Sequence, residues 1–263
     1  MISRAFVPTS AGTIHYATCG SGPPVLLLHQ TPRSWDEYRD VLPIIGEHFH
    51  AIAMDTIGFG DSDKPEATAS IEAFADGVIA FMDAMEIDRV PIVGHHTGGV
   101  IAIEVAARHP ERVERLVLSC TCCTDAEGRA LAATRPPIDA VIPKPDGSHL
   151  VELWNKRSGY YPKGRPDLLH RFVLDAMRIL ERVEEGHTAV HTYRMEEMLP
   201  LVVAPTRLIC GTDDWAAVGD QSRLAAALGG CEVVLIEGGG VALPDELPEA
   251  FAAAALDFLL AEI

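Results

Sequence analysis

The sequence GHHTGG at residues 94–99 places two imidazoles inside a run of small residues. An apolar stretch over residues 89–93 precedes it, and a segment of helical periodicity over residues 100–108 follows it. This order predicts a strand, a sharp turn and a helix, because small residues around such a turn let the backbone bend tightly and hold the side chain at its tip above the sheet. His96 is expected at that tip, where an imidazole can act as a base or as a nucleophile.

The elements around this turn are predicted from short apolar runs that alternate with helical segments, a pattern typical of a mostly parallel sheet with helices on both faces. Two strands at the start, residues 6–7 and 14–18, are expected to form a hairpin around residues 11–12. The other predicted strands are residues 25–29, 51–55, 90–93, 116–120, 206–210 and 232–236. The predicted helices are residues 34–45, 71–85, 100–109, 222–228 and 248–261.

The stretch between residues 120 and 206 has a different character and is too long for an ordinary loop. Prolines gather between residues 136 and 166, and two amphipathic segments follow, at residues 167–185 and 187–198. We predict that residues 125–197 form a helical cap, inserted after the sixth strand and lying over the sheet edge where open α/β sheets place their ligands. The core domain would then comprise residues 1–124 and 198–263.

Composition narrows the classes of partner. The chain has 263 residues, enough for one domain that buries its core without disulfides or metal. A formal net charge of −17 argues against nucleic acid and anionic membranes as partners, since both attract clustered Lys and Arg. No apolar run approaches the roughly 20 residues of a membrane helix, and no charged start followed by an apolar stretch opens the chain. We therefore expect a cytoplasmic protein, monomer or homodimer, with a small-molecule substrate.

Six cysteines fall mostly in or just beyond predicted buried strands, where a thiol behaves as a small hydrophobe and a reducing compartment is favoured. The cluster Cys120, Cys122 and Cys123 could also be a metal or redox site. Alternation along a strand sends neighbours to opposite faces, however, and no second Cys/His pair lies at zinc-finger spacing. We interpret these cysteines as buried thiols.

Three further motifs accompany the GHHTGG turn in a consistent order along the chain. They are HQTP at residues 29–32, DTIGFGDS at residues 55–62 followed by Lys64-Pro65, and GTDD at residues 211–214. Together the four motifs resemble the α/β-hydrolase superfamily, nearest to the branch that holds epoxide hydrolases, haloalkane dehalogenases and small esterases. The resemblance extends over nearly the whole chain and implies the α/β-hydrolase fold, with an eight-stranded, mostly parallel sheet and a helical cap.

The departures from this family fall among the residues that perform chemistry. His96 stands where the family has Ser, Asp or Cys, and an alignment anchored on residues 246–248 puts Val241 where it has its catalytic histidine. Gln30 stands where the H-G-x-P motif has glycine. Of the triad that the resemblance implies, only the acid remains, as Asp214.

Ordinary acyl-serine chemistry needs a hydroxyl, a base and an acid, so it is not implied for this chain. We hypothesise instead that His96 fills part of the space beside Val241 and that Asp214 accepts a hydrogen bond from one ring nitrogen, which makes the other a general base. That base could activate water, as in a hydrolase without a covalent intermediate, or remove a proton from the substrate, as in a lyase or isomerase. Backbone N–H groups of Thr97 and of Gln30 or Thr31 are expected to stabilise the oxyanion. Attack by His96 itself ranks lower, because nothing evident activates and releases it.

The substrate pocket is expected to include aromatic residues of the cap together with core residues near the turn. The predicted lining residues are His29, Trp154, Tyr161 and Val241. His29 could instead order its own loop, and the side chains of Trp154 and Tyr161 could simply pack the cap.

Other polar residues have structural explanations as well as functional ones. His95, Asp55 and Asp61 are interpreted as structural, the two acids through bonds to nearby backbone N–H groups. Four cap histidines are candidates for the missing catalytic partner: His149, His170, His187 and His191.

A metal site made of His29, His96 and Asp214 is conceivable, because imidazole and carboxylate suit zinc or iron. No H-x-H or H-E-x-x-H spacing supports it, so we predict neither metal nor cofactor. Two functional classes stay open: an enzyme with His96 as base, and a catalytically inactive small-ligand binding protein on the same scaffold. The enzyme is favoured because a reactive imidazole has replaced serine while Asp214 is retained.

Overall fold

The sheet is built from eight strands in the order β1-β2-β4-β3-β5-β6-β7-β8. The computed structural model describes residues 1–66 and 69–261. The strands are β1 (Ser3–Thr9), β2 (Gly12–Cys19), β3 (Pro24–Leu28), β4 (His50–Met54), β5 (Val90–His95), β6 (Val113–Ser119), β7 (Thr206–Gly211) and β8 (Glu232–Ile236). The pairs β1–β2 and β2–β4 are antiparallel and all other pairs are parallel, which confirms the predicted fold class.

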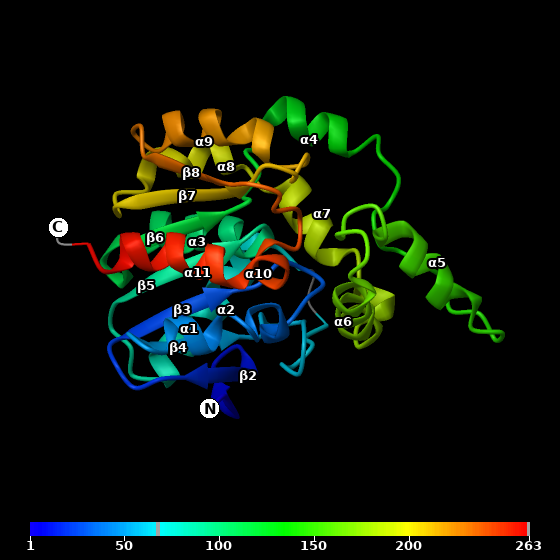
Figure 1. The fold of residues 1–263 in the computed structure, drawn as a ribbon, viewed down its shortest axis with the longest axis horizontal. Coiled ribbons are helices and arrows are strands. Elements are labelled where there is room, and N and C mark those ends of the chain that lie inside the picture. The colour runs from blue at the N-terminus through cyan, green and yellow to red at the C-terminus, as the bar shows by residue number, and fades with distance from the viewer. Residues whose placement is uncertain (67–68, 262–263) are drawn as a thin grey trace.

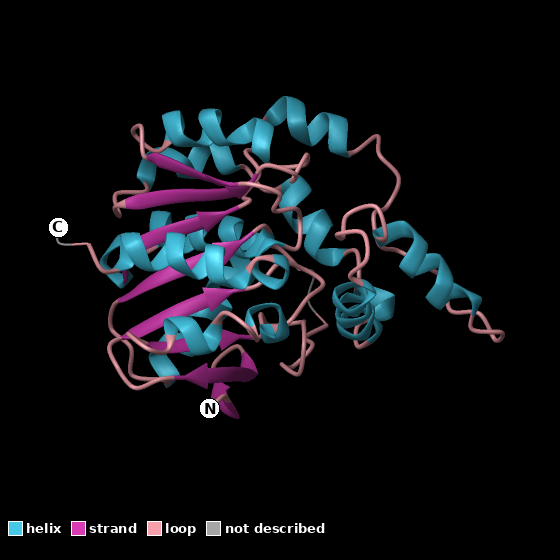
Figure 2. Cartoon of the chain, viewed as in Figure 1, coloured by secondary structure: helices cyan, strands magenta, loops and turns pink. Residues whose placement is uncertain are grey.

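Helices cover both faces of this sheet (Figure 2). Those of the core are α1 (Leu42–Ile45), α2 (Ile71–Ala84), α3 (Thr97–Arg108), α9 (Gln221–Ala227), α10 (Leu243–Glu246) and α11 (Pro248–Leu259). Short 3-10 turns are η1 (Trp35–Tyr38), η2 (Pro110–Arg112), η3 (Leu180–Arg182), η4 (Leu199–Leu201) and η5 (Val218–Asp220). One apolar cluster packs α2 and α3 on one face, and a second packs α1 and α11 on the other.

The predicted helix over residues 34–45 is wrong, because this segment is divided into η1 and α1. Ser34 caps η1 by accepting a hydrogen bond from the backbone N–H of Asp36. Pro43 lies in the first turn of α1 and has no backbone N–H, so a helix continuing through it from residue 35 would lose a hydrogen bond.

Five helices lie between β6 and β7, in the interval predicted for the cap. They are α4 (Ala126–Ala132), α5 (Ser148–Arg157), α6 (Pro166–Met177), α7 (Glu185–Thr192) and α8 (Met195–Met198). In Figure 1, α5 projects away from the sheet, whereas α6 and α7 lie near the carboxyl ends of the strands. Residues of α5 and α6 share a small apolar cluster of their own, but Ala189, Val190 and Met195 of α7 and α8 belong to the main core. The insertion is therefore anchored in the core at its C-terminal end.

Among the described residues, we find no helix that combines the length and the apolar character needed to cross a bilayer.

Candidate functional site

His96 occupies a strained turn between β5, which ends at His95, and α3, which begins at Thr97. Its backbone φ of 45° and ψ of −114° lie in a region that residues other than glycine rarely adopt. Glycine is needed on both sides: a Cβ at Gly98 would lie 1.9 Å from the carbonyl oxygen of Leu28, and one at Gly94 would lie 2.4 Å from that of Gly98. The backbone thus presents His96 at the carboxyl edge of the sheet.

Asp214 lies beside His96, because the turn after β7 ends at the same edge. Nε2 of His96 is 2.8 Å from Oδ2 of Asp214. Asp214 is fully buried, and the side chain of His96 is 17% exposed. Within residues 1–66 and 69–261 neither atom makes a well-aligned hydrogen bond, so the two atoms are in close contact, and a small rotation of the ring would turn that contact into a hydrogen bond.

Charge at this contact favours the ionised acid. Burial raises the pKa of Asp214, but the neighbouring His96 imidazole lowers it by more, so the net pKa lies below its usual value. Asp214 Oδ1 also accepts a hydrogen bond from the backbone N–H of Ala216 at 3.1 Å. The acid is therefore a fixed, ionised partner for His96.

His95 differs from its neighbour in being buried and fully hydrogen bonded. Its Nε2 is 2.9 Å from the carbonyl oxygen of Val241, and its Nδ1 is 2.9 Å from Oγ of Ser119. Because a carbonyl can only accept, Nε2 carries the proton and Nδ1 accepts from the hydroxyl. Burial lowers the pKa of His95 to about 3, so the ring is neutral. These contacts agree with the structural role predicted for His95.

The loop after β3 brings Thr31 to the turn but commits Gln30 elsewhere. The backbone N–H of Gln30 donates to Oε2 of Glu37 at 2.8 Å, and its side-chain Nε2 donates to Oε1 of Glu37 at 2.6 Å. That backbone hydrogen cannot also bind a substrate oxyanion, which corrects one of the two expected donors in this loop. Oγ1 of Thr31 lies 3.0 Å from Oγ1 of Thr97, so this loop is joined directly to the tight turn at residues 94–98 that carries His96 (the elbow).

His29 is not available to a ligand. Its Nδ1 donates to the carbonyl oxygen of Gln30 at 2.7 Å, and its Nε2 accepts from the backbone N–H of Thr56 at 3.0 Å. With both nitrogens occupied and the ring buried, His29 orders its own loop and cannot join a metal set with His96 and Asp214. Both the pocket and the metal interpretation of His29 are thereby corrected.

The remaining expected pocket residues lie in different environments. Val241 is buried, and its carbonyl oxygen accepts from His95 and, at 3.3 Å, from Nε2 of Gln30. Tyr161 is buried against Phe172, with ring centroids 5.6 Å apart. Trp154 lies on the projecting helix α5, in an apolar hollow shared with Val173 of α6. Trp154 also packs against the apolar cluster of the cap.

Two of the four cap histidines, His187 and His149, have partners of their own. Nε2 of His187 lies 2.8 Å from Oδ2 of Asp139, which also binds Arg157. Nδ1 of His149 accepts from the backbone N–H of Lys144 at 3.1 Å. Among the interactions found in the described part of the chain, none joins a cap histidine to Asp214. His96 is the imidazole that Asp214 contacts closely.

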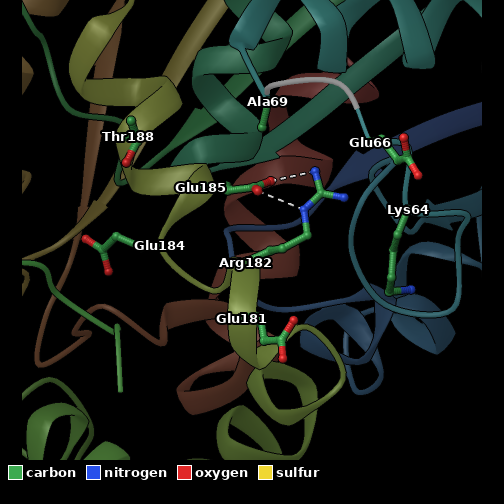
Figure 3. A pocket seen from close by; sticks show the side chains of 8 residues that line it. All are labelled: Lys64, Glu66, Ala69, Glu181, Arg182, Glu184, Glu185 and Thr188. Carbon is green, nitrogen blue, oxygen red and sulfur yellow. Dashed lines mark hydrogen bonds and ion pairs between the residues drawn. The ribbon is translucent and has the colours of Figure 1, made fainter. Parts of the chain in front are cut away.

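A hollow of about 490 Å³ lies between Lys64, Glu66 and Ala69 of the core and the cap segment at residues 181–188 (Figure 3). Its walls carry charged side chains, and on the cap side Arg182 pairs with Glu185. None of the candidate catalytic residues lines this hollow.

Two features of the site were missed by sequence reasoning. Arg33, two residues beyond Thr31, is fully buried and binds Asp175 of α6 and Asp245 of α10, which ties the cap to the core. Cys120 follows β6 with a positive φ of 46°, and its Sγ lies near both His96 and Asp214. Nothing in the local sequence distinguishes either residue from a surface arginine or a plain core cysteine.

Parts of the chain are similar in sequence to known proteins. A family model described as the alpha/beta hydrolase fold matches residues 23–243. A soluble epoxide hydrolase of Corynebacterium sp. (strain C12) is 40% identical over 105 residues, which cover 40% of this chain and 37% of that protein. Haloalkane dehalogenase 2 of Mycobacterium tuberculosis (strain ATCC 25618 / H37Rv) is 34% identical over 140 residues, 51% of this chain and 49% of that protein. The matches thus span about half or less of these relatives' length.

Solved structures resemble the chain over almost its full length. The enol-lactonase of Burkholderia xenovorans LB400 superposes with a TM-score of 0.80 at 21% identity, covering 98% of this chain and 100% of that one. A serine hydrolase involved in carbazole degradation superposes with a TM-score of 0.81 at 24% identity, covering 99% of both chains. At these identities the likeness concerns the fold alone.

Proposed function

Because this chain belongs to the alpha/beta hydrolase fold family, we propose that it is an enzyme acting on a small organic molecule, with the His96–Asp214 pair in place of the usual nucleophile and base. The observation that carries the proposal is the 2.8 Å contact between His96 Nε2 and Asp214 Oδ2 at the tip of a strained elbow. Such pairs of a reactive group and a fixed charge, held in an unfavourable backbone conformation, are typical of active sites.

The tautomer follows from the contact. An ionised carboxylate can only accept, so the proton on the His96 ring belongs on Nε2, and the lone pair is on Nδ1. Nδ1 makes no hydrogen bond that we find within the described residues, and the side chain is partly exposed. Nδ1 is therefore the general base in this proposal, and Asp214 fixes the ring and stabilises the imidazolium that forms.

Val241 explains why His96 must serve as the base itself. In the alignment with the family this position holds the catalytic histidine, and a valine cannot accept a proton. The buried Val241 backbone is held by His95 and Gln30, so the residue fills its place in the fold without contributing to proton transfer.

The oxyanion donors in this proposal are the backbone N–H groups of Thr97 and Thr31. The hydroxyl contact between these residues holds the loop against the first turn of α3. A helix N-terminus adds a favourable field for developing negative charge. Gln30 has a different task, since its bonds to Glu37 fix the loop from behind.

Water is the reactant that we favour for this base. The printed names of the relatives include a soluble epoxide hydrolase and 2-hydroxymuconate semialdehyde hydrolase, and such relatives do not favour the inactive binding protein. Removal of a substrate proton by the same Nδ1 would instead give lyase or isomerase chemistry. Reaction in ¹⁸O-labelled water separates the two, because only hydrolysis transfers the label to product.

The test is turnover of a panel of small epoxides, haloalkanes, lactones and esters by the unmodified protein and by His96→Ala and Asp214→Asn. Removing a positioned proton-transfer group should lower kcat by about 10²- to 10⁴-fold, with a much smaller change in KM. His149→Ala, on the exposed side of the cap, is the control and should leave turnover unchanged. Equal rates for the unmodified protein and His96→Ala would refute the proposal, and tight binding without turnover would favour the binding protein.

A further inference from the structure

Cys120 completes a group of three chemically different side chains at the carboxyl edge of the sheet. Its Sγ, a ring nitrogen of His96 and a carboxylate oxygen of Asp214 all lie within 4.8 Å of one another. Cys120 and Asp214 are fully buried. The backbone N–H of Cys120 is held by the carbonyl oxygen of Ile209 at 2.8 Å, so β6 and β7 fix this arrangement.

The polar atoms that face each other here are not satisfied by other groups. Nε2 of His96 and Oδ2 of Asp214 are both buried, and neither makes an aligned hydrogen bond within the described part of the chain. A buried carboxylate oxygen without a hydrogen bond is costly, and a cation is one of the ligands that relieves the cost.

A thiolate, an imidazole and a carboxylate are a ligand set that zinc accepts, each at about 2.0–2.3 Å in a tetrahedral arrangement. Those bond lengths place ligand atoms about 3.4–3.6 Å apart. The nitrogen and oxygen, now 2.8 Å apart, need to separate by well under 1 Å, and the sulfur, which lies within 4.8 Å of both, needs to approach them by little more than about 1 Å at most. A water molecule would complete the four ligands that zinc prefers.

We propose that His96, Cys120 and Asp214 bind a divalent transition-metal ion of the zinc type, and that the bound ion switches off the general base. The metal site stands on the geometry alone, whereas the inhibition of the general base rests on the proposed function. Metal binding displaces the thiol proton, and it occupies Nε2 with the lone pair of the ring. A neutral imidazole bound through Nε2 keeps its one proton on Nδ1, so the nitrogen that should accept a proton no longer can.

A second group of possible ligands, His15, Asp55 and Asp61, serves as a contrast. Nδ1 of His15 lies 2.8 Å from Oδ2 of Asp55, and Asp55 also accepts from the backbone N–H of Trp35. Asp61 is paired with Arg178. These atoms have partners already, so the group is explained by the structure of its loops.

The binding test uses chelator-treated protein titrated with Zn²⁺ against a chromophoric chelator, and with Co²⁺ as a spectroscopic probe. We expect one ion per chain and a thiolate-to-cobalt charge-transfer absorption. Cys120→Ser should abolish that absorption, and Cys120→Ser and Asp214→Asn should each weaken Zn²⁺ binding by at least tenfold, since even residues that only orient metal ligands are worth that much. Cys122→Ser is the matched control, because Cys122 lies two residues away and outside the group, and it should change neither result. Circular dichroism checks that each variant is folded.

Absence of saturable binding, or binding that survives both Cys120→Ser and Asp214→Asn, overturns the site. The inhibition is tested separately, by the Zn²⁺ concentration that halves turnover, which should rise at least tenfold in Cys120→Ser relative to that variant's own metal-free rate. If zinc binds without any effect on turnover, only the proposed inhibition is overturned and the metal site stands. Turnover that does not depend on His96 refutes the proposed function and leaves the metal site to be judged by the binding data.

Discussion

The buried arginine that ties the cap to the core allows a quantitative prediction, through Asp175→Asn. Nε of Arg33 donates to Oδ2 of Asp175 at 2.9 Å, and Oγ of Ser34 donates to Oδ1 at 2.9 Å. Arg33 is fully buried and Asp175 nearly so. The substitution keeps the shape of the side chain and removes its charge, so it leaves part of the buried guanidinium charge unbalanced.

The magnitude follows from the geometry. Two unit charges 2.9 Å apart in a medium of effective dielectric constant about 20 attract by about 6 kcal/mol, against which stands the cost of removing both from water. Breaking a buried pair by removing one partner costs about 3–5 kcal/mol. Because Arg33 keeps Asp245 and, at 3.4 Å, Asp36, we expect a value at the lower end, about 3 kcal/mol.

Urea unfolding with linear extrapolation measures this change in the free energy of unfolding. The matched control is Asp167→Asn on the same helix, whose carboxylate is exposed and pairs only with the exposed Arg165 within the described interactions. We expect no measurable change for the control. A loss below about 1 kcal/mol for Asp175→Asn would refute the view that this ion pair locks the cap to the loop carrying Thr31.

Three more predictions concern the same region. Burial raises the pKa of Glu37 to about 8, so the folded chain keeps a proton that the unfolded chain releases near pH 4.5. The contribution of Glu37 to the free energy of unfolding should therefore be greatest below pH 4.5. It should fall by up to about 1.4 kcal/mol per pH unit as the pH rises towards 8. Glu37→Gln should flatten this slope in urea unfolding between pH 5 and 8, and an unchanged slope would assign it to other groups. Gly186→Ala would place a Cβ 2.0 Å from Oγ1 of Thr31, so it should cost about 1–3 kcal/mol and lower kcat, whereas Gly159→Ala, with open space around it, should do neither. A fluorophosphonate should not label the protein by intact mass, because the elbow has no serine and the nearest hydroxyl, Thr97, is bonded to Thr31; stoichiometric labelling would contradict the site.

The fold and the elbow could be predicted because their signals are local. Apolar runs and their spacing define each strand, and glycines beside His96 reveal a turn that only glycine allows at Gly94 and Gly98. The order of the motifs also predicted that Asp214 and His96 lie at the same edge of the sheet, because the carboxyl ends of parallel strands meet at one edge.

The contacts that depend on distant residues could not be predicted in this way. The commitment of the Gln30 N–H to Glu37 depends on how η1 turns back, and that turn was expected as part of a longer helix. Strand alternation argued against a metal site at Cys120, but its positive φ takes this residue out of the strand pattern, so the argument did not apply to it. From the sequence, His187 was a candidate for the missing catalytic partner. Only the structure shows that it pairs with Asp139, 48 residues away in the chain.

The position of the cap within the strand order has a consequence for the order in which the chain folds. Strands β5 and β6 pair across a short separation, with Gly94 opposite Leu118, whereas Leu116 of β6 pairs with Thr206 of β7 only after the whole cap has been spanned. Closing a longer loop costs more chain entropy, although the cost grows slowly with length. We therefore expect the elbow to form early in a nucleus around β3, β5 and β6, and β7 to dock later. Asp214 arrives with β7, so the acid and His96 meet only at a late stage of assembly, and any transient detachment of β7 and β8 would part them while leaving the elbow intact.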